Sequence, residues 1–191
     1  MEIKYKLYPY PVLSSYSNDY GTGAFDVAID IVRDGYDLRI DFLATLTCQS
    51  LQDCIKQGVA KFVYHLECSQ TGFRTVVQTD KVSEVYTLLN KAVNGKLQIC
   101  PFVVAVDDLK GFTSPDFHED YQGIAFDIEA GCVMAVGKMV TVDISKDIDD
   151  LANTPSIFNI SKNPDESCKQ MLVDMSQRKI IIKLPLSDFY S

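Results

Sequence analysis

Residues 25–42 read FDVAIDIVRDGYDLRIDF, with apolar side chains at alternate positions on both sides of Asp34-Gly35. A period of two is typical of a strand with one buried face. An Asp-Gly pair between two such runs predicts a hairpin with a type I′ turn, because both central residues of that turn need positive φ. Counting outward from the turn gives the expected cross-strand pairs: Arg33 with Tyr36, Ile31 with Leu38, Asp30 with Arg39, Ile29 with Ile40, and Val27 with Phe42. The apolar pairs share one face, which we expect to be buried.

The rest of the chain repeats this strand-like pattern in short apolar runs separated by turn residues. Tight turns are expected at Gly131 and Gly137. Residues 82–93 fit either a helical stripe or a strand ending at Asn94-Gly95, and the β-rich surroundings favour the strand. The further strands are expected over residues 3–8, 60–68, 73–78, 96–106, 124–128, 132–136, 139–144, 156–161, 170–175 and 179–184.

One short helix is expected after the hairpin. Ser50 is its expected N-cap, because a hydroxyl there can accept a hydrogen bond from the first helical turn. Leu51, Cys54 and Ile55 form one apolar stripe, and Gly58 is expected to end the helix. A further single helical turn is expected over residues 147–152.

Short strands at this spacing predict a mainly β, or β-rich α+β, fold. We expect antiparallel sandwich or barrel-like sheets with one to three short helices. The chain is divided into residues 1–94, which carry the 25–43 hairpin, and residues 95–191, with one continuous domain as the alternative. Residues 185–191 resemble a helix start, so an N-terminal part of a longer protein is a second interpretation.

The chain is acidic, because 26 Asp and Glu residues against 18 Lys and Arg residues give a formal net charge of −8. Such a charge repels phosphate backbones, so we expect no broad nucleic-acid binding. The N-terminus lacks a signal-peptide core, and no apolar run approaches the roughly 18–20 residues that span a bilayer. The sequence therefore predicts no membrane partner and a soluble, bacterial-type cytoplasmic protein.

The cysteines are scattered singly along the chain, and none forms a Cys-x-x-Cys pair of the kind that binds zinc. In a cytoplasmic protein we expect reduced thiols, packed as small hydrophobic side chains. They are Cys48, Cys54, Cys68, Cys100, Cys132 and Cys168.

Residues 111–123 form a loop in which several kinds of titratable side chain gather: Asp116, His118, Glu119 and Asp120. These are ligands that divalent metal ions accept, so the four residues are the candidate metal site. The alternative is a solvated loop, in which Phe117 and Tyr121 pack inward. Under that alternative Asp116, Glu119 and Asp120 stay largely exposed, because three carboxylates could not be buried together without a metal or basic partners.

Catalytic motifs are otherwise missing. Pro115-Asp116 followed by Asp127 and Glu129 partly resembles the acidic pattern of metal-dependent nucleases, but Glu129 is followed by Ala130 and Gly131, so the lysine that the pattern needs is missing. The sequence contains no phosphate-binding P-loop and no Gly-x-Ser-x-Gly elbow.

Aromatic residues are the other compositional signal, since the chain has 10 Tyr and 10 Phe but no Trp. Tyrosine is enriched at interfaces, so the N-terminal arm is a candidate partner-binding segment, although packing on its own core is the commoner arrangement. The candidate residues are Tyr8, Tyr10, Tyr16 and Tyr20. The sequence thus favours a non-catalytic interaction or assembly module without a cofactor, which binds a protein partner or forms a homo-oligomer. The alternative is a metal-dependent hydrolase or nuclease-like enzyme that uses the 111–123 loop.

Overall fold

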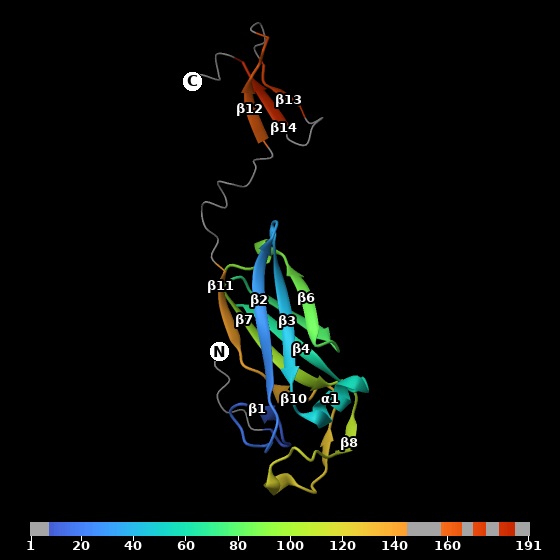
Figure 1. Ribbon diagram of the computed structural model, residues 1–191. Helices are drawn as coiled ribbons and strands as arrows, with labels where there is room; N and C mark the ends of the chain where they lie inside the picture. The colour runs from blue at the N-terminus through green and yellow to red at the C-terminus, as the bar shows by residue number, and fades with distance from the viewer. Residues whose placement is uncertain (1–7, 145–157, 166–169, 175–179, 186–191) are drawn as a thin grey trace. The chain divides into compact units, whose positions relative to one another are not determined.

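The computed structural model in Figure 1 describes residues 8–144, 158–165, 170–174 and 180–185. The chain forms two compact units, Met1–Ser145 and Lys146–Ser191. Residues on either side of position 94 share one sheet, because β4 (Ala60–Cys68) pairs with β7 (Gly95–Ala105). The strand expected at residues 3–8 and the helical turn expected at residues 147–152 fall almost wholly outside the described residues.

The first unit contains two main sheets. The larger has the strand order β1-β10-β7-β4-β5, with β11 also paired to β7, and the smaller has the order β2-β3-β6. A third pairing joins β8 to β9. The remaining bounds are β1 (Leu13–Ser14), β2 (Phe25–Asp34), β3 (Asp37–Leu46), β5 (Phe73–Thr79), β6 (Ser83–Leu88), β8 (Leu109–Phe112), β9 (Phe126–Ile128), β10 (Val133–Val136) and β11 (Val140–Ile144).

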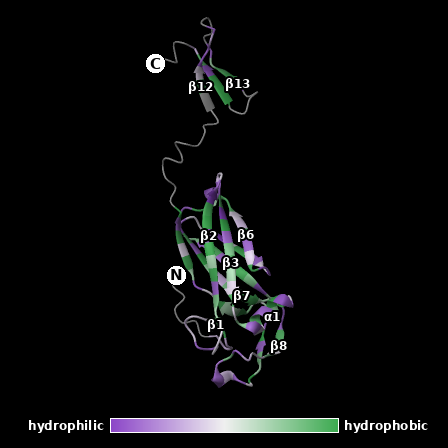
Figure 2. Ribbon diagram, viewed as in Figure 1, coloured by the Kyte–Doolittle hydropathy of each residue, from purple (hydrophilic) through white to green (hydrophobic). Residues whose placement is uncertain are grey.

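The two main sheets pack face to face as layers of a β-rich sandwich, so the mainly β prediction is confirmed. Phe42 on β3 stacks on Tyr64 of β4 with 4.2 Å between ring centroids, and Phe25 stacks on Phe62 at 5.9 Å. Figure 2 shows apolar residues recurring along β2 and β3 between hydrophilic ones, as expected for strands with one buried face. The prediction of a strand within residues 82–93 is also confirmed, since β6 lies there.

The predicted hairpin is present, but its register is different. Asp34 pairs with Asp37, so Gly35 and Tyr36 form the loop, and Gly35 has φ +62°. The type I′ turn centred on Asp34-Gly35 was therefore wrong, because Gly35 takes the first loop position rather than the second. The apolar pairs become Ile31 with Ile40, Ile29 with Phe42, and Val27 with Ala44.

Each observed cross-strand partner thus lies two residues from the predicted one. An even shift leaves every side chain on its predicted face. Ile40 is fully buried, whereas Ile29 is only half-buried. Asp30 lies opposite Asp41 rather than Arg39. Two carboxylates in that position repel each other, and the Arg39 guanidinium offsets this by a bidentate contact with Asp41 at 2.9 Å to each carboxylate oxygen.

Helix α1 (Gln49–Lys56) follows the hairpin and buries the predicted stripe of Leu51, Cys54 and Ile55. Its N-cap is Cys48 rather than Ser50, because the helix begins two residues earlier than predicted. Gly58 has φ +79°, and its N–H donates to the carbonyl of Ile55 at 3.0 Å. The Val59 N–H donates to Cys54 at 3.0 Å, which completes a Schellman motif and confirms Gly58 as the stop signal.

Strands β10 and β11 do not form the hairpin predicted from Gly137. Both lie along the same side of β7, where Val136 pairs with Phe102 and Val140 pairs with Ile99. The chain is irregular between them, and the Gly137 N–H donates to the carbonyl of Pro101 at 2.9 Å. Proline has no N–H to offer a neighbouring strand, so the break falls where β7 cannot complete its ladder.

The turn predicted at Gly131 is present, but the strands on its two sides do not pair with each other. Gly131 has φ +86° and lies between β9 and β10, but β9 pairs with β8 and β10 pairs with β7. The β8 strand and the short parallel pairing of β1 with β10 were not predicted. Both are short, at four residues in β8 and two in β1, so neither produces a visible sequence period.

The second unit contributes a three-stranded sheet with the order β12-β14-β13. Its strands are β12 (Phe158–Lys162), β13 (Leu172–Asp174) and β14 (Ile180–Leu184), all near predicted positions. β12 runs parallel to β14, and β13 runs antiparallel to it. Among the described residues of both units, no helix has the length and apolar character needed to cross a bilayer.

Candidate functional site

The predicted metal-site residues lie in the loop between β8 and β9, which contains a short 3₁₀ helix (Glu119–Tyr121). Phe117 is 3% exposed, which confirms its inward packing. Its ring lies 5.0 Å from that of Tyr20 and 5.9 Å from that of Phe126, and Tyr121 packs against Phe126 at 6.0 Å. These aromatic contacts fix the loop to the rest of the unit.

Asp116 is half-buried rather than largely exposed. Its carboxylate accepts hydrogen bonds from the Thr22 hydroxyl at 3.0 Å and from the Cys48 thiol at 3.3 Å. Its backbone carbonyl accepts the Gly21 N–H at 2.9 Å. The expectation of an exposed Asp116 was therefore wrong, because neutral donors satisfy the carboxylate without a metal or a basic partner. Glu119 and Asp120 are exposed, as predicted.

Cys48 belongs to a small polar network at the start of α1. Its sulfur lies 3.2 Å from the Ser50 hydroxyl, which in turn lies 2.7 Å from the Ser114 hydroxyl. The Asp116 N–H donates to Ser114 at 3.1 Å and closes the network. Burial raises the pKa of the Cys48 thiol, and the thiol is fully buried. It therefore stays protonated and donates a hydrogen bond instead of acting as a nucleophile.

His118 turns toward a different partner. Its Nδ1 lies 3.2 Å from the Asp120 carboxylate and also accepts the Asp120 N–H at 3.4 Å. The four candidate residues therefore do not form one site. Asp116 is half-buried and bonded to Thr22 and Cys48, His118 lies beside Asp120, and Glu119 is exposed. The part of the chain that the structure describes contains no group of three or more His, Cys, Asp and Glu side chains able to hold a metal ion.

We expect excess Mg²⁺, Mn²⁺ or Zn²⁺ to leave the thermal unfolding midpoint unchanged. Thr22 and Cys48 already occupy the Asp116 oxygens, so a cation would have to displace both hydrogen bonds to bind there. A thermal melt with and without each ion is the measurement. A midpoint that rises with metal concentration, and no longer rises in a His118→Ala variant, would instead support the hydrolase alternative, because binding to the native state stabilises it by mass action.

The four candidate partner-binding tyrosines are all half-buried. Tyr10 packs against the core, and Tyr20 packs on Phe117. The rings of Tyr8 and Tyr10 lie 5.9 Å apart. Burial raises the pKa of each of these tyrosines. In this structure the described part of the arm makes contacts with its own unit.

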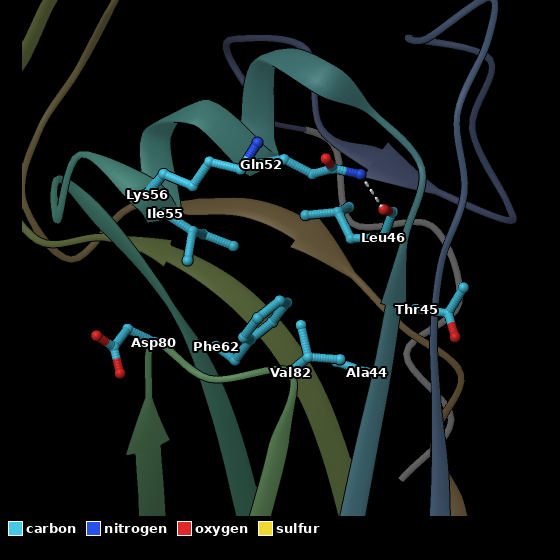
Figure 3. A pocket seen from close by; sticks show the side chains of 9 residues that line it. All are labelled: Ala44, Thr45, Leu46, Gln52, Ile55, Lys56, Phe62, Asp80 and Val82. Carbon is cyan, nitrogen blue, oxygen red and sulfur yellow. Dashed lines mark hydrogen bonds between the residues drawn. The ribbon is translucent and has the colours of Figure 1, made fainter.

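A pocket that the sequence did not predict opens at one end of the sandwich (Figure 3). Its cavity volume is about 390 Å³. The side chains of Ile55, Phe62 and Val82 point toward one another across it. It is lined by Ala44, Thr45, Leu46, Gln52, Ile55, Lys56, Phe62, Asp80 and Val82. These residues come from β3, α1, β4 and the β5–β6 connection, so no single sequence segment carries its pattern.

The polar groups of the pocket lie around the apolar walls. The Gln52 amide donates to the Leu46 carbonyl at 2.5 Å, which ties α1 to the end of β3. Lys56 forms an ion pair with Asp53 at 3.4 Å. The Asp80 carboxylate has no ion pair within the described residues. Val82 is 56% exposed, which is unusual for a valine beside a buried core and marks the open side of the pocket.

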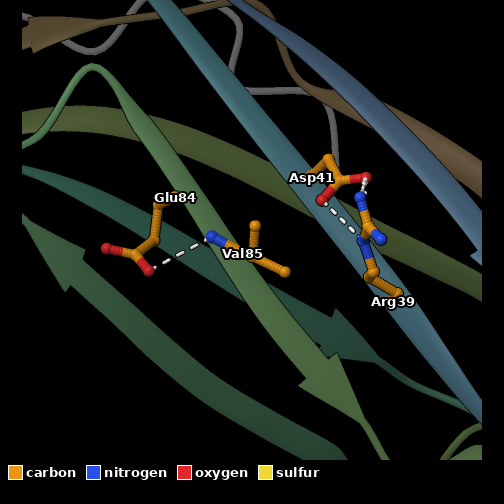
Figure 4. Close-up of polar contacts among 4 residues, drawn as sticks. All are labelled: Arg39, Asp41, Glu84 and Val85. Carbon is orange, nitrogen blue, oxygen red and sulfur yellow. Dashed lines mark hydrogen bonds and ion pairs between the residues drawn. The ribbon is translucent and has the colours of Figure 1, made fainter.

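Each edge strand of the β2-β3-β6 sheet carries a carboxylate bonded to its own backbone, as Figure 4 shows for β6. On β6 the Glu84 carboxylate accepts the N–H of Val85 at 3.1 Å. On β2 the Asp26 carboxylate accepts the N–H of Val27 at 2.9 Å. Hydrogen bonds from the Thr79 hydroxyl and the Val85 N–H hold the pKa of Glu84 below its usual value. Charged residues on edge strands are a common means of preventing edge-to-edge association.

No protein-family model matches the sequence. No curated protein matches it either. Among solved structures, the thioester domain of the Enterococcus faecium TIE86 protein is similar to this chain with a TM-score of 0.32 and 8% sequence identity. The similarity covers 66% of this chain and 45% of that chain. At this TM-score no shared function follows.

Proposed function

We propose that this chain is a non-catalytic interaction module that holds an apolar side chain of a protein partner in the pocket of Figure 3. The observation that carries the proposal is the cavity of about 390 Å³ with apolar walls and an exposed Val82 at its open side. Concave, mostly apolar sites with a few polar groups are the usual places where proteins hold ligands.

The polar groups of the pocket suit binding better than catalysis. Gln52 already donates to Leu46, and Lys56 already pairs with Asp53. The lining contains no histidine, cysteine or serine, and among the described hydrogen bonds none joins its Thr45 hydroxyl to Lys56 or Asp80 as a nucleophile paired with a base would be joined. Apolar walls with a charged group at the rim can bury a partner's apolar side chain while polar groups beside it stay hydrated.

The test is a selection of displayed random peptides on the purified chain. We expect the selected peptides to share a bulky apolar residue, such as Leu, Met or Phe. Replacing Val82 with Lys puts a charged chain at the pocket and should weaken their binding by about tenfold or more, which corresponds to about 1.4 kcal/mol. Titration calorimetry with one selected peptide measures the change.

The matched control is Val85→Lys. Val85 is 52% exposed, close to the 56% of Val82, but it lies on β6 outside the pocket. Peptide affinity should be the same in this variant as in the wild type. A selection that enriches no peptide, or a Val82→Lys variant that binds as tightly as Val85→Lys, would refute the proposal.

A further inference from the structure

The outer edge of β5 is the feature on which this inference depends. β5 pairs with β4 along its whole length, from Phe62 opposite Thr79 to Cys68 opposite Phe73. It stands at the end of the strand order, so no described strand pairs with its other side. In an antiparallel pair, alternate residues direct their N–H and C=O groups away from the neighbour, so β5 offers a row of such groups outward.

This edge lacks the protection seen on the smaller sheet. There, Asp26 and Glu84 each accept the N–H of the next residue on β2 and β6. Among the hydrogen bonds of the described residues, none joins a side chain to a backbone N–H between positions 74 and 79. An unprotected edge strand of seven residues is long enough to accept another strand by main-chain hydrogen bonds.

Charge selects what can approach that edge. The chain has a formal net charge of −8, so two copies repel each other over most of their surfaces. β5 itself contains no Asp or Glu, and Arg74 is its one charged residue. Arg74 pairs with Glu67 through one guanidinium nitrogen at 3.0 Å, so its other N–H groups can still donate. Asp80 is the residue directly after β5 and has no ion pair within the described residues.

We infer that β5 pairs antiparallel with β5 of a second copy of this chain, with Val77 on the two-fold axis. A two-fold interface requires that if one residue contacts another, the reverse contact also exists. In this register Arg74 of each copy faces Asp80 of the other, so the pairing forms two intermolecular ion pairs. The cross-strand pairs are Arg74 with Asp80, Thr75 with Thr79, Val76 with Gln78, and Val77 with itself.

The second copy fits better than an unrelated strand because the complementary charges stand at opposite ends of the same strand of one chain. Arg74 and Asp80 lie three residues on either side of Val77, which is the spacing that an antiparallel two-fold pairing needs. Opposite-charge, Thr–Thr and aliphatic cross-strand pairs each favour such a ladder. The pocket is lined by Asp80 but by no other residue of this pairing, and the pocket variant Val82→Lys leaves Asp80 unchanged.

Sedimentation velocity of the full chain over a range of concentrations tests the inference. The wild type should change from monomer to dimer as concentration rises. Arg74→Glu and Asp80→Lys each place like charges opposite each other at two positions, and each should weaken dimerisation by about tenfold or more. The double variant Arg74→Glu/Asp80→Lys restores opposite charges and should dimerise like the wild type.

Two controls separate this result from a loss of folding and from the pocket. Each variant should keep the wild-type thermal midpoint within a few degrees at low concentration. The pocket variant Val82→Lys should dimerise as the wild type does, whether or not it binds peptides. A wild type that stays monomeric, single variants that dimerise normally, or a double variant that stays monomeric would overturn the proposed pairing.

Discussion

Phe42→Ala is expected to lower the free energy of unfolding by about 3–5 kcal/mol, because it removes a buried aromatic ring and leaves a cavity. Phe42 is 1% exposed, and its ring lies 4.2 Å from that of Tyr64 with only 2° between the ring planes. This stack joins the two sheets of the sandwich at their centre. The side chains around the cavity come from strands of both sheets, so they can collapse into it only in part. Urea denaturation followed by circular dichroism measures the loss.

Leu43→Ala is the control for Phe42→Ala. Leu43 is the next residue on β3, faces the opposite side of the sheet and is 53% exposed. Its truncation should change stability by less than about 0.5 kcal/mol, as is usual for surface substitutions. Equal losses in the two variants would show that the inner face of β3 is not the one described.

Gly137→Ala is expected to destabilise the first unit by about 1–3 kcal/mol, because the added methyl group overpacks a filled space. A Cβ at this position would lie 2.9 Å from Cγ of Pro101 and 3.3 Å from Cε1 of Phe25. Both neighbours belong to rings inside the fold, so neither can move aside without disturbing the ladder next to β7. Urea denaturation under the same conditions gives the comparison.

Gly21→Ala serves as the control for Gly137→Ala. A Cβ at Gly21 would meet its nearest atom, the Phe117 carbonyl oxygen, at 3.6 Å, which is an ordinary contact. This variant should be near neutral, because alanine also has fewer unfolded conformations than glycine. If Gly137→Ala were as stable as Gly21→Ala, the close approach of Pro101 to position 137 would be refuted.

The sequence predicted features that depend on neighbouring residues. The alternation in residues 25–42 placed each side chain on the correct face, and the stripe of Leu51, Cys54 and Ile55 located the buried side of α1. The predicted register of the hairpin was wrong because Gly35 suits either loop position, and both registers leave every side chain on the same face. Pro101 is a signal that sequence reading could have used, since a proline inside a central strand indicates an interrupted neighbour.

The candidate site could be predicted only in part, because its contacts join residues far apart in the chain. Asp116 accepts hydrogen bonds from Thr22, 94 residues away, and from Cys48, 68 residues away. Nothing near Asp116 in the sequence indicates those donors, so three adjacent carboxylates were expected to share one exposed environment. The pocket was missed for the same reason, since Ala44, Phe62 and Val82 belong to separate elements.

The edge-strand carboxylates Asp26 and Glu84 differ in how their substitution would affect stability. Asp26 bonds the N–H of the next residue on its own strand and links no two elements of the fold, whereas Glu84 also accepts a hydrogen bond from the Thr79 hydroxyl of β5. A neutral substitution at Asp26 is therefore expected to change the free energy of unfolding by less than about 0.5 kcal/mol, while it leaves the β2 edge open to association at high protein concentration. A loss of solubility caused at this edge would then leave no trace in a measurement of stability.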